Sequence, residues 1–433
     1  MIGSITIGVL SFAPQWAGYF KNDFNKAALE KVAEKKEKTK EELIAEALEK
    51  SKEIKALYMT ADVANDQGAG ATGLRNNIIR IVEATEINGL VIDVKEVCGP
   101  DYDERNLKQL LEELRQKNIW TMARIVVFKD ASQIDIHPEW YLKRKQIKAV
   151  GDGCWRKRHL REIATDGKKP NAILWQDNKG GYWLDPASEE ARNYILEFSK
   201  KMIDFGFDEL QFDYIRFPSD GDVENAIYPV RDGKMSKYLT MKEFFEFLNN
   251  NLKAYKSDII LSADLFGYAA IRAGDVGIGQ RLEDIGDNFD YISFMVYPSH
   301  YYNGLYLPAD PSRNLTVVEL TRAGARANPG IVVMRSLQSA RDFLDGRIAT
   351  TTYSGFSRAT STLETVKNPV PHSRARLRPW LEDFFHEEDK VLGRPFGVDK
   401  VKMQIEGAEQ VEKHGWMLWN ASNIYTEGAL RRE

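Results

Sequence analysis

An aspartate at the end of an apolar segment is the first candidate for chemistry in this sequence. The segment Gly206–Pro218 reads Gly-Phe-Asp-Glu-Leu-Gln-Phe-Asp-Tyr-Ile-Arg-Phe-Pro, so Asp213 and Arg216 emerge beside aromatic rings. A carboxylate and a guanidinium at the mouth of a buried strand cost solvation free energy, and proteins keep them mainly where they bind or react. A second aspartate, Asp264, ends the next apolar segment.

Two carboxyl groups on neighbouring strands suit the hydrolysis of a glycosidic bond. One carboxyl protonates the departing oxygen while the other attacks the sugar or activates water, at separations of roughly 5–10 Å. We assign Asp213 as the nucleophile or base and Asp264 as the acid. We expect Arg216 to hold Asp213 in its ionised form.

Polar and aromatic residues also follow the other apolar segments. Aromatic faces stack on sugars as well as filling cores. We therefore expect a substrate site that includes Asp93, Lys95, Arg216, Tyr297, His300, Trp380, Trp419 and Asn420. Three further carboxylates, taken singly, are better explained as salt bridges or helix caps: Asp62, Asp130 and Glu382.

The triplet Asp93-Val-Lys95 admits a different chemistry. Residues two apart on a strand share a face, and a desolvated lysine can form a Schiff base, as in barrel aldolases. No phosphate-binding glycine loop follows the last two apolar segments. The favoured interpretation is therefore an ion pair of Lys95 with Asp93 or Asp213, and a lyase or aldolase stays an alternative.

A glycine-rich segment matches a dinucleotide fingerprint. Gly68-Ala-Gly-Ala-Thr-Gly73 has the spacing G-x-G-x-x-G, it precedes a helical pattern, and Asp93 lies about twenty residues onward. However, residues 62–67 separate the preceding strand from the first glycine, whereas the fingerprint needs its turn directly after the strand. We expect no nucleotide and no other cofactor.

Short apolar runs alternate with amphipathic ones, as expected of a (β/α)8 TIM barrel with a charged helical N-terminal extension. The eight predicted strands are Ala56–Thr60, Gly89–Val94, Trp120–Phe128, Glu209–Ile215, Ile259–Phe266, Tyr291–Val296, Arg376–Leu381 and Gly415–Trp419. The predicted helices include Leu74–Glu86, Arg105–Lys117, Glu189–Phe205, Met241–Tyr255, Pro329–Leu344 and Val398–Lys413. The apolar run Ile331–Met334 resembles a strand, but we assign it to a helix because it follows Pro329.

Two long connections follow predicted strands and so belong to the face where barrels carry their active sites. Residues 129–185 contain Asp177-Asn-Lys-Gly-Gly181, which predicts a hairpin turn. Residues 346–374 are rich in Ser and Thr and predict a loose loop.

The composition excludes several classes of protein. The chain has 433 residues and a net charge of -4, which argues against nucleic-acid binding. Its two cysteines, Cys98 and Cys154, provide no disulfide framework; one bridge between them is possible, but nothing in the sequence supports it. Six scattered histidines without a His-x-x-x-His pair predict no metal site.

The N-terminal region differs from the rest. Residues 2–20 are mostly apolar without a basic leader, which fits a trimmed or atypical export signal, an anchor or a first strand. Residues 21–55 are rich in Ala, Glu and Lys and predict a solvated helix. We divide the chain into residues 1–54 and a barrel of residues 55–433. We expect the N-terminus to associate with a membrane or the cell envelope, and a cytoplasmic location if no export signal is present.

Seven ordered motifs carry a family resemblance. They are Ala56–Thr60, Glu86–Lys95, Trp183–Pro186, Gly206–Pro218, Phe294–Tyr301, Arg378–Leu381 and Gly415–Asn420. Together these motifs resemble the bacterial "putative glycoside hydrolase domain" family, a TIM-barrel group loosely related to amylase-like glycosidases. The resemblance implies that Asp213 is the nucleophile and that the protein is exported or membrane-anchored. Amylases place a glutamate after the fifth strand where this chain has Asp264, and Glu382 stands where relatives would have glutamine.

The combined interpretation is a glycoside hydrolase that acts on a polysaccharide or a cell-envelope glycan. The rival from another class is a glycan-binding barrel without catalysis. A separation of Asp213 and Asp264 above about 10 Å would favour that rival, because the pair could not flank one bond. Structural salt bridges that tie up one of the two carboxylates entirely would favour it as well.

Overall fold

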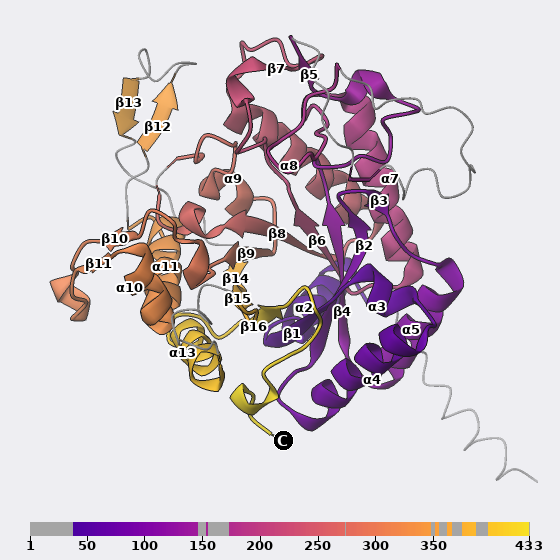
Figure 1. Cartoon of the computed structure of the whole chain (residues 1–433), viewed down its shortest axis with the longest axis vertical. Coiled ribbons are helices and arrows are strands. Elements are labelled where there is room, and N and C mark those ends of the chain that lie inside the picture. Colours follow the sequence, from indigo (N-terminus) through magenta and orange to yellow (C-terminus); the bar gives the residue numbers. More distant parts are fainter. Residues whose placement is uncertain are drawn as a thin grey trace, which may run out of the picture.

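The computed structural model describes residues 38–145, 153–154, 173–272, 274–347, 351–354, 362–365, 375–386 and 397–432. A closed barrel of eight parallel strands forms its centre (Figure 1). In chain order the barrel strands are β1 (Ile54–Met59), β2 (Gly89–Glu96), β4 (Trp120–Val126), β6 (Glu209–Asp213), β8 (Ile260–Phe266), β9 (Tyr291–Met295), the pair β14 (Arg376–Leu377) and β15 (Trp380–Glu382), and β16 (Gly415–Trp419). The barrel closes because β1 pairs with both β2 and β16. The predicted (β/α)8 fold is confirmed.

Helices cover the outside of the barrel. They are α3 (Ala61–Asn65), α4 (Ala69–Ala84), α5 (Glu104–Gln116), α7 (Glu189–Phe205), α8 (Lys237–Tyr255), α9 (Leu282–Gly286), α10 (Arg322–Ala327), α11 (Pro329–Leu344) and α13 (Val398–Glu409). In α5 the buried residues Leu107, Leu110, Leu111 and Leu114 recur at helical spacing, so one stripe faces the strands. The assignment of Ile331–Met334 to a helix is confirmed by α11.

The seventh strand is interrupted at Arg378-Pro379. Proline has no backbone N–H for the ladder, and its carbonyl instead accepts a hydrogen bond from Met417 (2.9 Å). The backbone pairing with the neighbouring strands is therefore interrupted between β14 and β15. The single predicted strand 376–381 is in fact these two short strands.

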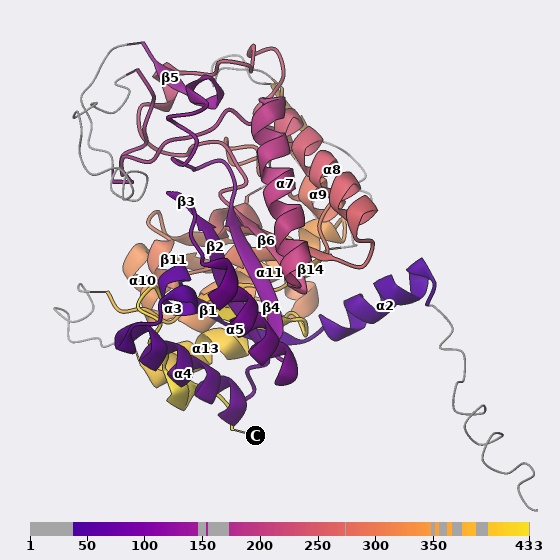
Figure 2. The same cartoon turned by 90° about the vertical axis from the view of Figure 1, so that its right-hand side faces the viewer.

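The N-terminal helix α2 (Lys40–Lys50) lies at the amino-terminal end of the barrel, and Figure 2 shows it projecting to one side of the strands. Its end is tied to the barrel, because Arg376 donates to the carbonyl of Leu48 (2.7 Å) and the Tyr291 hydroxyl donates to the carbonyl of Ser51 (2.8 Å). The predicted charged helix is thus present over part of residues 21–55. The apolar segment 2–20 lies outside the described residues, and the division at residue 54 stays a prediction.

Short elements occupy the connections between the barrel strands and the helices, and those that follow β2 and β4 lie in the upper part of Figure 2. The β-elements among them are β3 (Gly99–Pro100), β5 (Lys143–Arg144), β7 (Ala226–Ile227), β10 (Leu305–Leu307) and β11 (Val318–Leu320). Short 3-10 turns are η1 (Pro138–Trp140), η2 (Val223–Asn225), η3 (Gly267–Ala270), η4 (Pro298–His300), η5 (Pro311–Arg313) and η6 (Glu427–Ala429). The predicted turn at residues 177–181 is confirmed, since Gly180 N–H donates to the carbonyl of Asp177 (3.0 Å).

Two other predictions meet the structure here. The connection 346–374 is not wholly loose, because β12 (Thr351–Ser354) pairs antiparallel with β13 (Thr362–Thr365). Helix α3 separates β1 from the glycine-rich segment, as expected for a chance match to the dinucleotide fingerprint. Among the residues described, no helix combines the length and apolar composition of a membrane span.

Candidate active site

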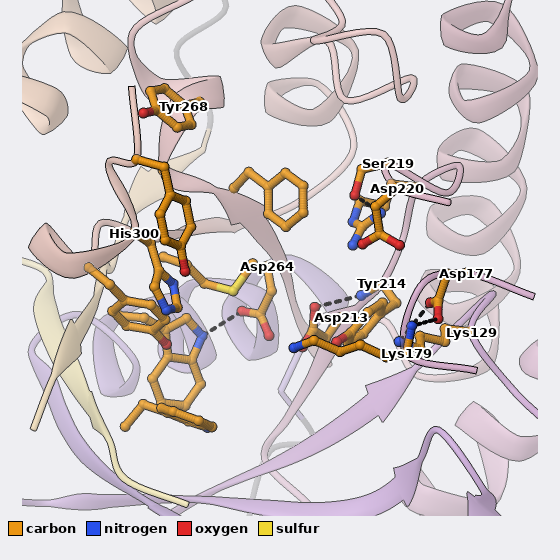
Figure 3. Close-up of a pocket in the computed structure, with 18 of the residues that line it drawn as sticks. Lys129, Asp177, Lys179, Asp213, Tyr214, Ser219, Asp220, Asp264, Tyr268 and His300 are labelled. Carbon is orange, nitrogen blue, oxygen red and sulfur yellow. Dashed lines mark hydrogen bonds and ion pairs between the residues drawn. The ribbon is translucent and has the colours of Figure 1, made fainter. Parts of the chain in front are cut away.

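A pocket of about 480 Å³ opens at the carboxyl ends of the barrel strands. Asp213 and Asp264 lie at its centre in Figure 3, with aromatic side chains on one side and charged side chains on the other. Asp213 ends β6 and Asp264 lies on the adjacent strand β8. Parallel strands deliver their last side chains to one end of the barrel, so this geometry follows from the fold.

Arg124 of β4 joins the two carboxylates. Its Nη2 forms an ion pair with Asp213, its Nη1 lies 2.6 Å from Asp93, and its Nε lies 4.0 Å from Asp264 Oδ2. The same guanidinium contacts Asp213 and Asp264. The nearest oxygens of these two carboxyl groups are therefore no farther apart than the roughly 9.5 Å upper limit of glycosidase carboxylate pairs. The expectation that Arg216 is the ion partner of Asp213 is wrong.

The sequence contains a signal for Arg124 that motif reasoning missed. Met122, Arg124 and Val126 alternate along β4, so the side chain of Arg124 shares a face with apolar neighbours. A cation at such a position needs buried counter-charges. The arginine reaches Asp93 and Asp213 on the strands to either side of β4.

Asp264 is buried, and its two carboxyl oxygens differ in their hydrogen bonds. Its Oδ1 accepts hydrogen bonds from Gln211 Nε2 and from Trp380 Nε1, both at 2.7 Å, the latter drawn in Figure 3. Its Oδ2 has no hydrogen-bond partner within the described chain. Burial raises the pKa of Asp264 well above its usual range and the charge of Asp213 raises it further, while Arg124 opposes both effects. The raised pKa favours the protonated form of this carboxyl, and Oδ2 is the oxygen that no N–H group occupies.

Asp213 is held by its own backbone as well as by Arg124. The N–H of Tyr214 donates to Asp213 Oδ1 (2.6 Å), and Figure 3 draws this bond. Tyr214 has φ of 50°, a left-handed conformation that is unfavourable for a bulky side chain. This turn ends β6 and places Tyr214 itself in the lining of the pocket. Strain of this kind is concentrated at functional sites.

An aromatic wall, defined as Tyr297, His300, Tyr302, Trp380 and Trp419, lines one side of the pocket. The rings of Tyr297 and Trp419 are stacked with centroids 6.0 Å apart, and those of His300 and Tyr302 are stacked at 5.8 Å. Burial lowers the pKa of His300 to about 4, and the nearby His386, Lys179 and Arg322 contribute. His300 is therefore neutral at pH 7. Four of these five residues were expected from the sequence, and Tyr302 was not.

A charged wall, defined as Lys129, Asp177, Lys179, Arg216 and Asp220, faces the aromatic one. Lys129 pairs with Asp177 (2.8 Å), which also accepts hydrogen bonds from Gly181 N–H and Trp183 Nε1. These residues come from the loops after β4 and β6. Of this wall, only Arg216 was expected from the sequence, because loop residues follow no strand periodicity.

Lys95 is not in this pocket. Its ammonium is fully buried, donates to the carbonyl of Val126 (2.6 Å) and pairs with Asp130 (2.6 Å). Burial lowers the pKa of Lys95, and Asp130 opposes that effect. The ion partner is therefore neither Asp93 nor Asp213, and a lysine enclosed in this way cannot reach a carbonyl group of a substrate. The placement argues against the Schiff-base chemistry and against direct substrate contact.

Three further residues support the site without lining it in the described structure. Asp93 is buried between Arg124 and the hydroxyl of Tyr58. Asn420 donates to the carbonyls of Asp383 and Ile424, so it shapes the loop after β16. Glu382 accepts hydrogen bonds from the backbone and hydroxyl of Ser299. Asp93 and Asn420 were expected to bind substrate directly, whereas their bonds are with the protein.

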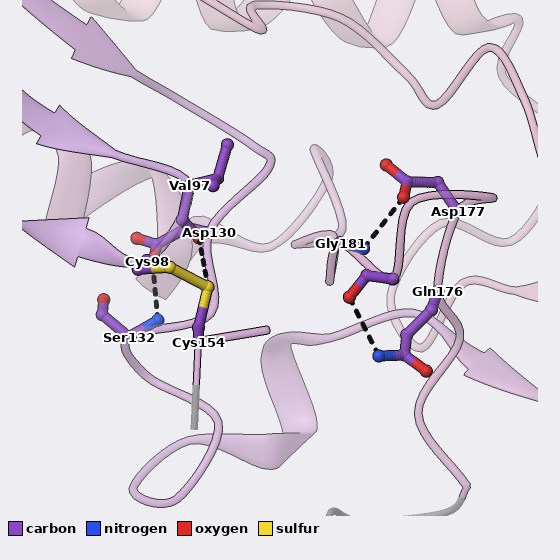
Figure 4. The surroundings of a disulfide bond; sticks show 9 residues. Val97, Cys98, Asp130, Ser132, Cys154, Gln176, Asp177 and Gly181 are labelled. Atoms are coloured by element: carbon purple, nitrogen blue, oxygen red, sulfur yellow. Dashed lines mark hydrogen bonds between the residues drawn. A yellow bond between two sulfur atoms is a disulfide. The ribbon is translucent and has the colours of Figure 1, made fainter. Parts of the chain in front are cut away.

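A disulfide joins Cys98 to Cys154 (Figure 4). It connects the end of the second strand to the long connection after β4, across 56 residues of sequence. Sequence reasoning found no support for this bridge, because two cysteines so far apart become neighbours only when both loops fold over one end of the barrel. No cluster of His, Cys, Asp and Glu in the described residues could hold a metal ion.

The fold and the paired carboxylates define a TIM-barrel protein with a glycosidase-like site. The family described as "Putative glycosyl hydrolase domain" matches residues 56–425, and the chain belongs to it. The expected family membership is thus confirmed, and at family level the protein is a glycoside hydrolase. No curated protein matches the sequence.

Three solved structures illustrate the similarity of fold. A hypothetical protein from Ruminiclostridium thermocellum ATCC 27405 is 24% identical, with 48% of this chain and 96% of that chain covered and a TM-score of 0.36. An alpha-amylase from Geobacillus thermoleovorans, complexed with acarbose, is 11% identical over 88% and 74% of the chains, with a TM-score of 0.44. A debranching enzyme from Nostoc punctiforme is 11% identical over 85% and 74%, also at 0.44. These scores are too low to support an argument about function.

Proposed function

We propose that the protein hydrolyses a glycosidic bond in a polysaccharide or cell-envelope glycan, with Asp213 as the nucleophile or base and Asp264 as the acid. The observation that carries the proposal is that two neighbouring carboxyl groups in one pocket have different electrostatic surroundings. Asp213 is paired with a guanidinium, whereas Asp264 favours its protonated form. Environments that separate the protonation of two carboxyl groups are how glycosidases assign an acid and a base.

The hydrogen bonds of Asp264 suit a proton donor. The N–H groups of Gln211 and Trp380 occupy Oδ1, so the acidic proton belongs on Oδ2. Within the described residues no protein acceptor competes for that proton, and Asp264 lines the pocket. A glycosidic oxygen held near Oδ2 would receive the proton as its bond to the sugar carbon breaks.

Asp213 suits the second role. Arg124 donates to Oδ2 and the N–H of Tyr214 donates to Oδ1, so both oxygens are held in place. In a double displacement, an oxygen of Asp213 would bond to the sugar carbon and water would later replace it. In a single displacement, Asp213 would take a proton from an attacking water. The aromatic wall supplies flat surfaces for a sugar ring.

Two observations would favour the glycan-binding alternative: carboxylates too far apart, or one of them tied up entirely in salt bridges. Asp213 does pair with Arg124, but it still lines the pocket. Both carboxylates lie within glycosidase range, and both line the pocket. The disulfide supports an oxidising location and so an exported protein. Association of the N-terminus with a membrane or envelope remains part of the proposal.

The test begins with a panel of bacterial and plant glycans, which identifies the sugar released by the wild-type protein. Aryl glycosides of that sugar then separate the two roles. Asp264→Asn should keep activity on a dinitrophenyl glycoside, whose leaving group needs no proton, and lose it on a phenyl or alkyl glycoside. Asp213→Asn should lose activity on all of them.

Asp62→Asn is the matched control, because Asp62 follows β1 but is exposed in α3. Equal product release by wild type and Asp213→Asn would remove Asp213 from the mechanism. Equal losses of Asp264→Asn on good and poor leaving groups would contradict the acid role.

A further inference from the structure

Arg216 stands out among the charged side chains of the pocket. Only 6% of it is exposed, and its guanidinium lies among three aromatic rings. The guanidinium carbon is 4.3 Å from the ring centroid of Phe266, 5.0 Å from that of Trp183 and 5.2 Å from that of Tyr214. These rings fix the plane of the guanidinium. They also exclude the water that would otherwise solvate it.

The hydrogen bonds of Arg216 leave one edge of the guanidinium open. Nη1 donates to the carbonyl of Phe217 (2.9 Å) and to the hydroxyl of Ser219 (3.3 Å). Within the described chain, Nε and Nη2 have no hydrogen-bond acceptor and the guanidinium has no ion pair. Arg216 lines the pocket, so the open edge belongs to a side chain more than nine-tenths buried at a ligand site.

The carboxylates around Arg216 are already engaged. Asp213, Asp220 and Asp177 favour its charge from beyond ion-pair distance, in that order. Asp213 is paired with Arg124 and Asp177 with Lys129, while Asp220 accepts from the N–H of Asn178 (3.1 Å). Burial nevertheless lowers the pKa of Arg216, so desolvation of the guanidinium outweighs their combined effect.

A buried cation without a counter-ion is unfavourable unless a bound ligand supplies the opposite charge. Nε and Nη2 lie on the same edge of a guanidinium and present two parallel N–H donors, a geometry that matches the two oxygens of a carboxylate. Lys179 adds a second positive charge to the same wall, and it is close enough to His300 to lower the pKa of that imidazole. A neutral sugar would leave this charge uncompensated.

We propose that the substrate is an acidic saccharide and that Arg216 binds the carboxylate of one of its sugar units through Nε and Nη2. The inference deepens the proposed function and rests on it, because the open edge of Arg216 shares the pocket with Asp213 and Asp264. The aromatic wall then holds the sugar ring, and the charged wall selects the acid group.

Binding can be measured without turnover in the Asp264→Asn variant. The probes are the methyl glycosides of glucuronic and galacturonic acid in both anomers, each titrated beside the matching glucoside or galactoside by calorimetry. We expect at least one acidic probe to bind about tenfold or more tightly than its neutral counterpart. Arg216→Met should abolish that preference, whereas Lys179→Met should only reduce it.

Arg272→Met is the matched control, because Arg272 packs over Tyr268 at the surface and does not line the pocket in the described structure. Thermal unfolding checks that Arg216→Met is folded; methionine fits among aromatic rings without a desolvation cost. A merely structural Arg216 would weaken acidic and neutral probes equally. That result overturns the inference, as does an acidic preference that survives Arg216→Met or the absence of any preferred acidic probe.

The outcomes separate this inference from the proposed hydrolysis. If the wild-type protein hydrolyses neutral glycans and Arg216→Met does so equally well, the acidic substrate is excluded and the hydrolase stands. If acidic probes bind through Arg216 but wild type and Asp213→Asn release no product from any acidic glycan, the binding site stands and the hydrolase falls.

Discussion

The two ends of the barrel differ in whether their buried charged groups have partners within the protein. At the amino-terminal end, Glu209 and Arg378 are both fully buried and pair at 2.8 Å. Trp120 Nε1 donates to Glu209, Arg378 Nη2 donates to the carbonyl of Ser51, and the guanidinium lies 3.7 Å from the ring centroid of Tyr291. Glu209 and Arg378 therefore balance each other within the protein.

At the carboxyl-terminal end, some charged groups lack hydrogen-bond partners. Arg124 balances Asp213 and Asp93, and its Nε lies 4.0 Å from Asp264 Oδ2. However, Asp264 Oδ2 and one edge of Arg216 have no hydrogen-bond partner in the described chain. Both ends use similar residue types on the same strands, since Glu209 and Asp213 belong to β6. The difference therefore separates charges that hold the barrel together from charges that await a ligand.

The largest expected effect is on activity at the carboxyl-terminal end. Asp264→Asn should lower kcat on a natural glycan by about 10²–10⁴-fold, because the leaving oxygen loses its proton donor. Stability should fall little, since burial and the charge of Asp213 already disfavour the ionised form of the carboxyl that the amide replaces. Steady-state kinetics and urea unfolding measure the two effects. A large loss of stability would mean that Asp264 is a structural charge like Glu209.

The reverse pattern is expected at the amino-terminal end. Glu209→Gln should lower the free energy of unfolding by about 3–5 kcal/mol, because it leaves Arg378 buried without a counter-ion. The kcat of the folded fraction should stay unchanged, since neither residue lines the pocket in the described structure. Urea unfolding followed by tryptophan fluorescence gives the first value. A stability change below about 1 kcal/mol would contradict the comparison of the two ends.

The pH dependence of activity and stability should sharpen the comparison. The raised pKa of Asp264 keeps this acid protonated to higher pH than an ordinary aspartate, so kcat/KM should fall about tenfold per pH unit only above that pKa. Asp264→Asn should abolish this alkaline decrease in the residual activity. An unchanged alkaline decrease would mean that another group causes it.

Stability should depend on pH through the same group. A carboxyl whose pKa is raised on folding stabilises the protein below its unfolded pKa, and that contribution is lost as pH rises through the folded value.

The smallest expected effect concerns the rim of the pocket. Tyr302 is 58% exposed and stacks beside His300, so Tyr302→Ala should remove about 0.5–1.5 kcal/mol of contact with a sugar ring. KM should rise by about 2–13-fold while kcat stays unchanged. Tyr306→Ala is the matched control, because Tyr306 is 65% exposed and lies outside the pocket lining. Equal effects of the two variants would show that Tyr302 does not contact substrate.

Much of the barrel could be predicted from periodicity alone. The eight strands lie within a few residues of their predicted bounds, and α7 and α11 begin and end where the sequence placed them. The one irregular strand contains Pro379, whose missing N–H is itself a sequence signal. Asp213 and Asp264 were found because each lies at or near the carboxyl end of an apolar strand, and the barrel brings these ends together.

The pairing of long side chains could not be predicted in this way. Arg216 lies nearer to Asp213 in sequence, yet Arg124 reaches Asp213 from a neighbouring strand, and Lys95 turns away to Asp130. The sequence by itself determined which strands form and which side chains arrive at the mouth of the barrel, because these depend on local periodicity and chain order. Only the tertiary structure decided which charges meet and which stay open. Strand register, loop packing and the reach of each side chain set those distances, and residues far apart in the chain contribute to all three.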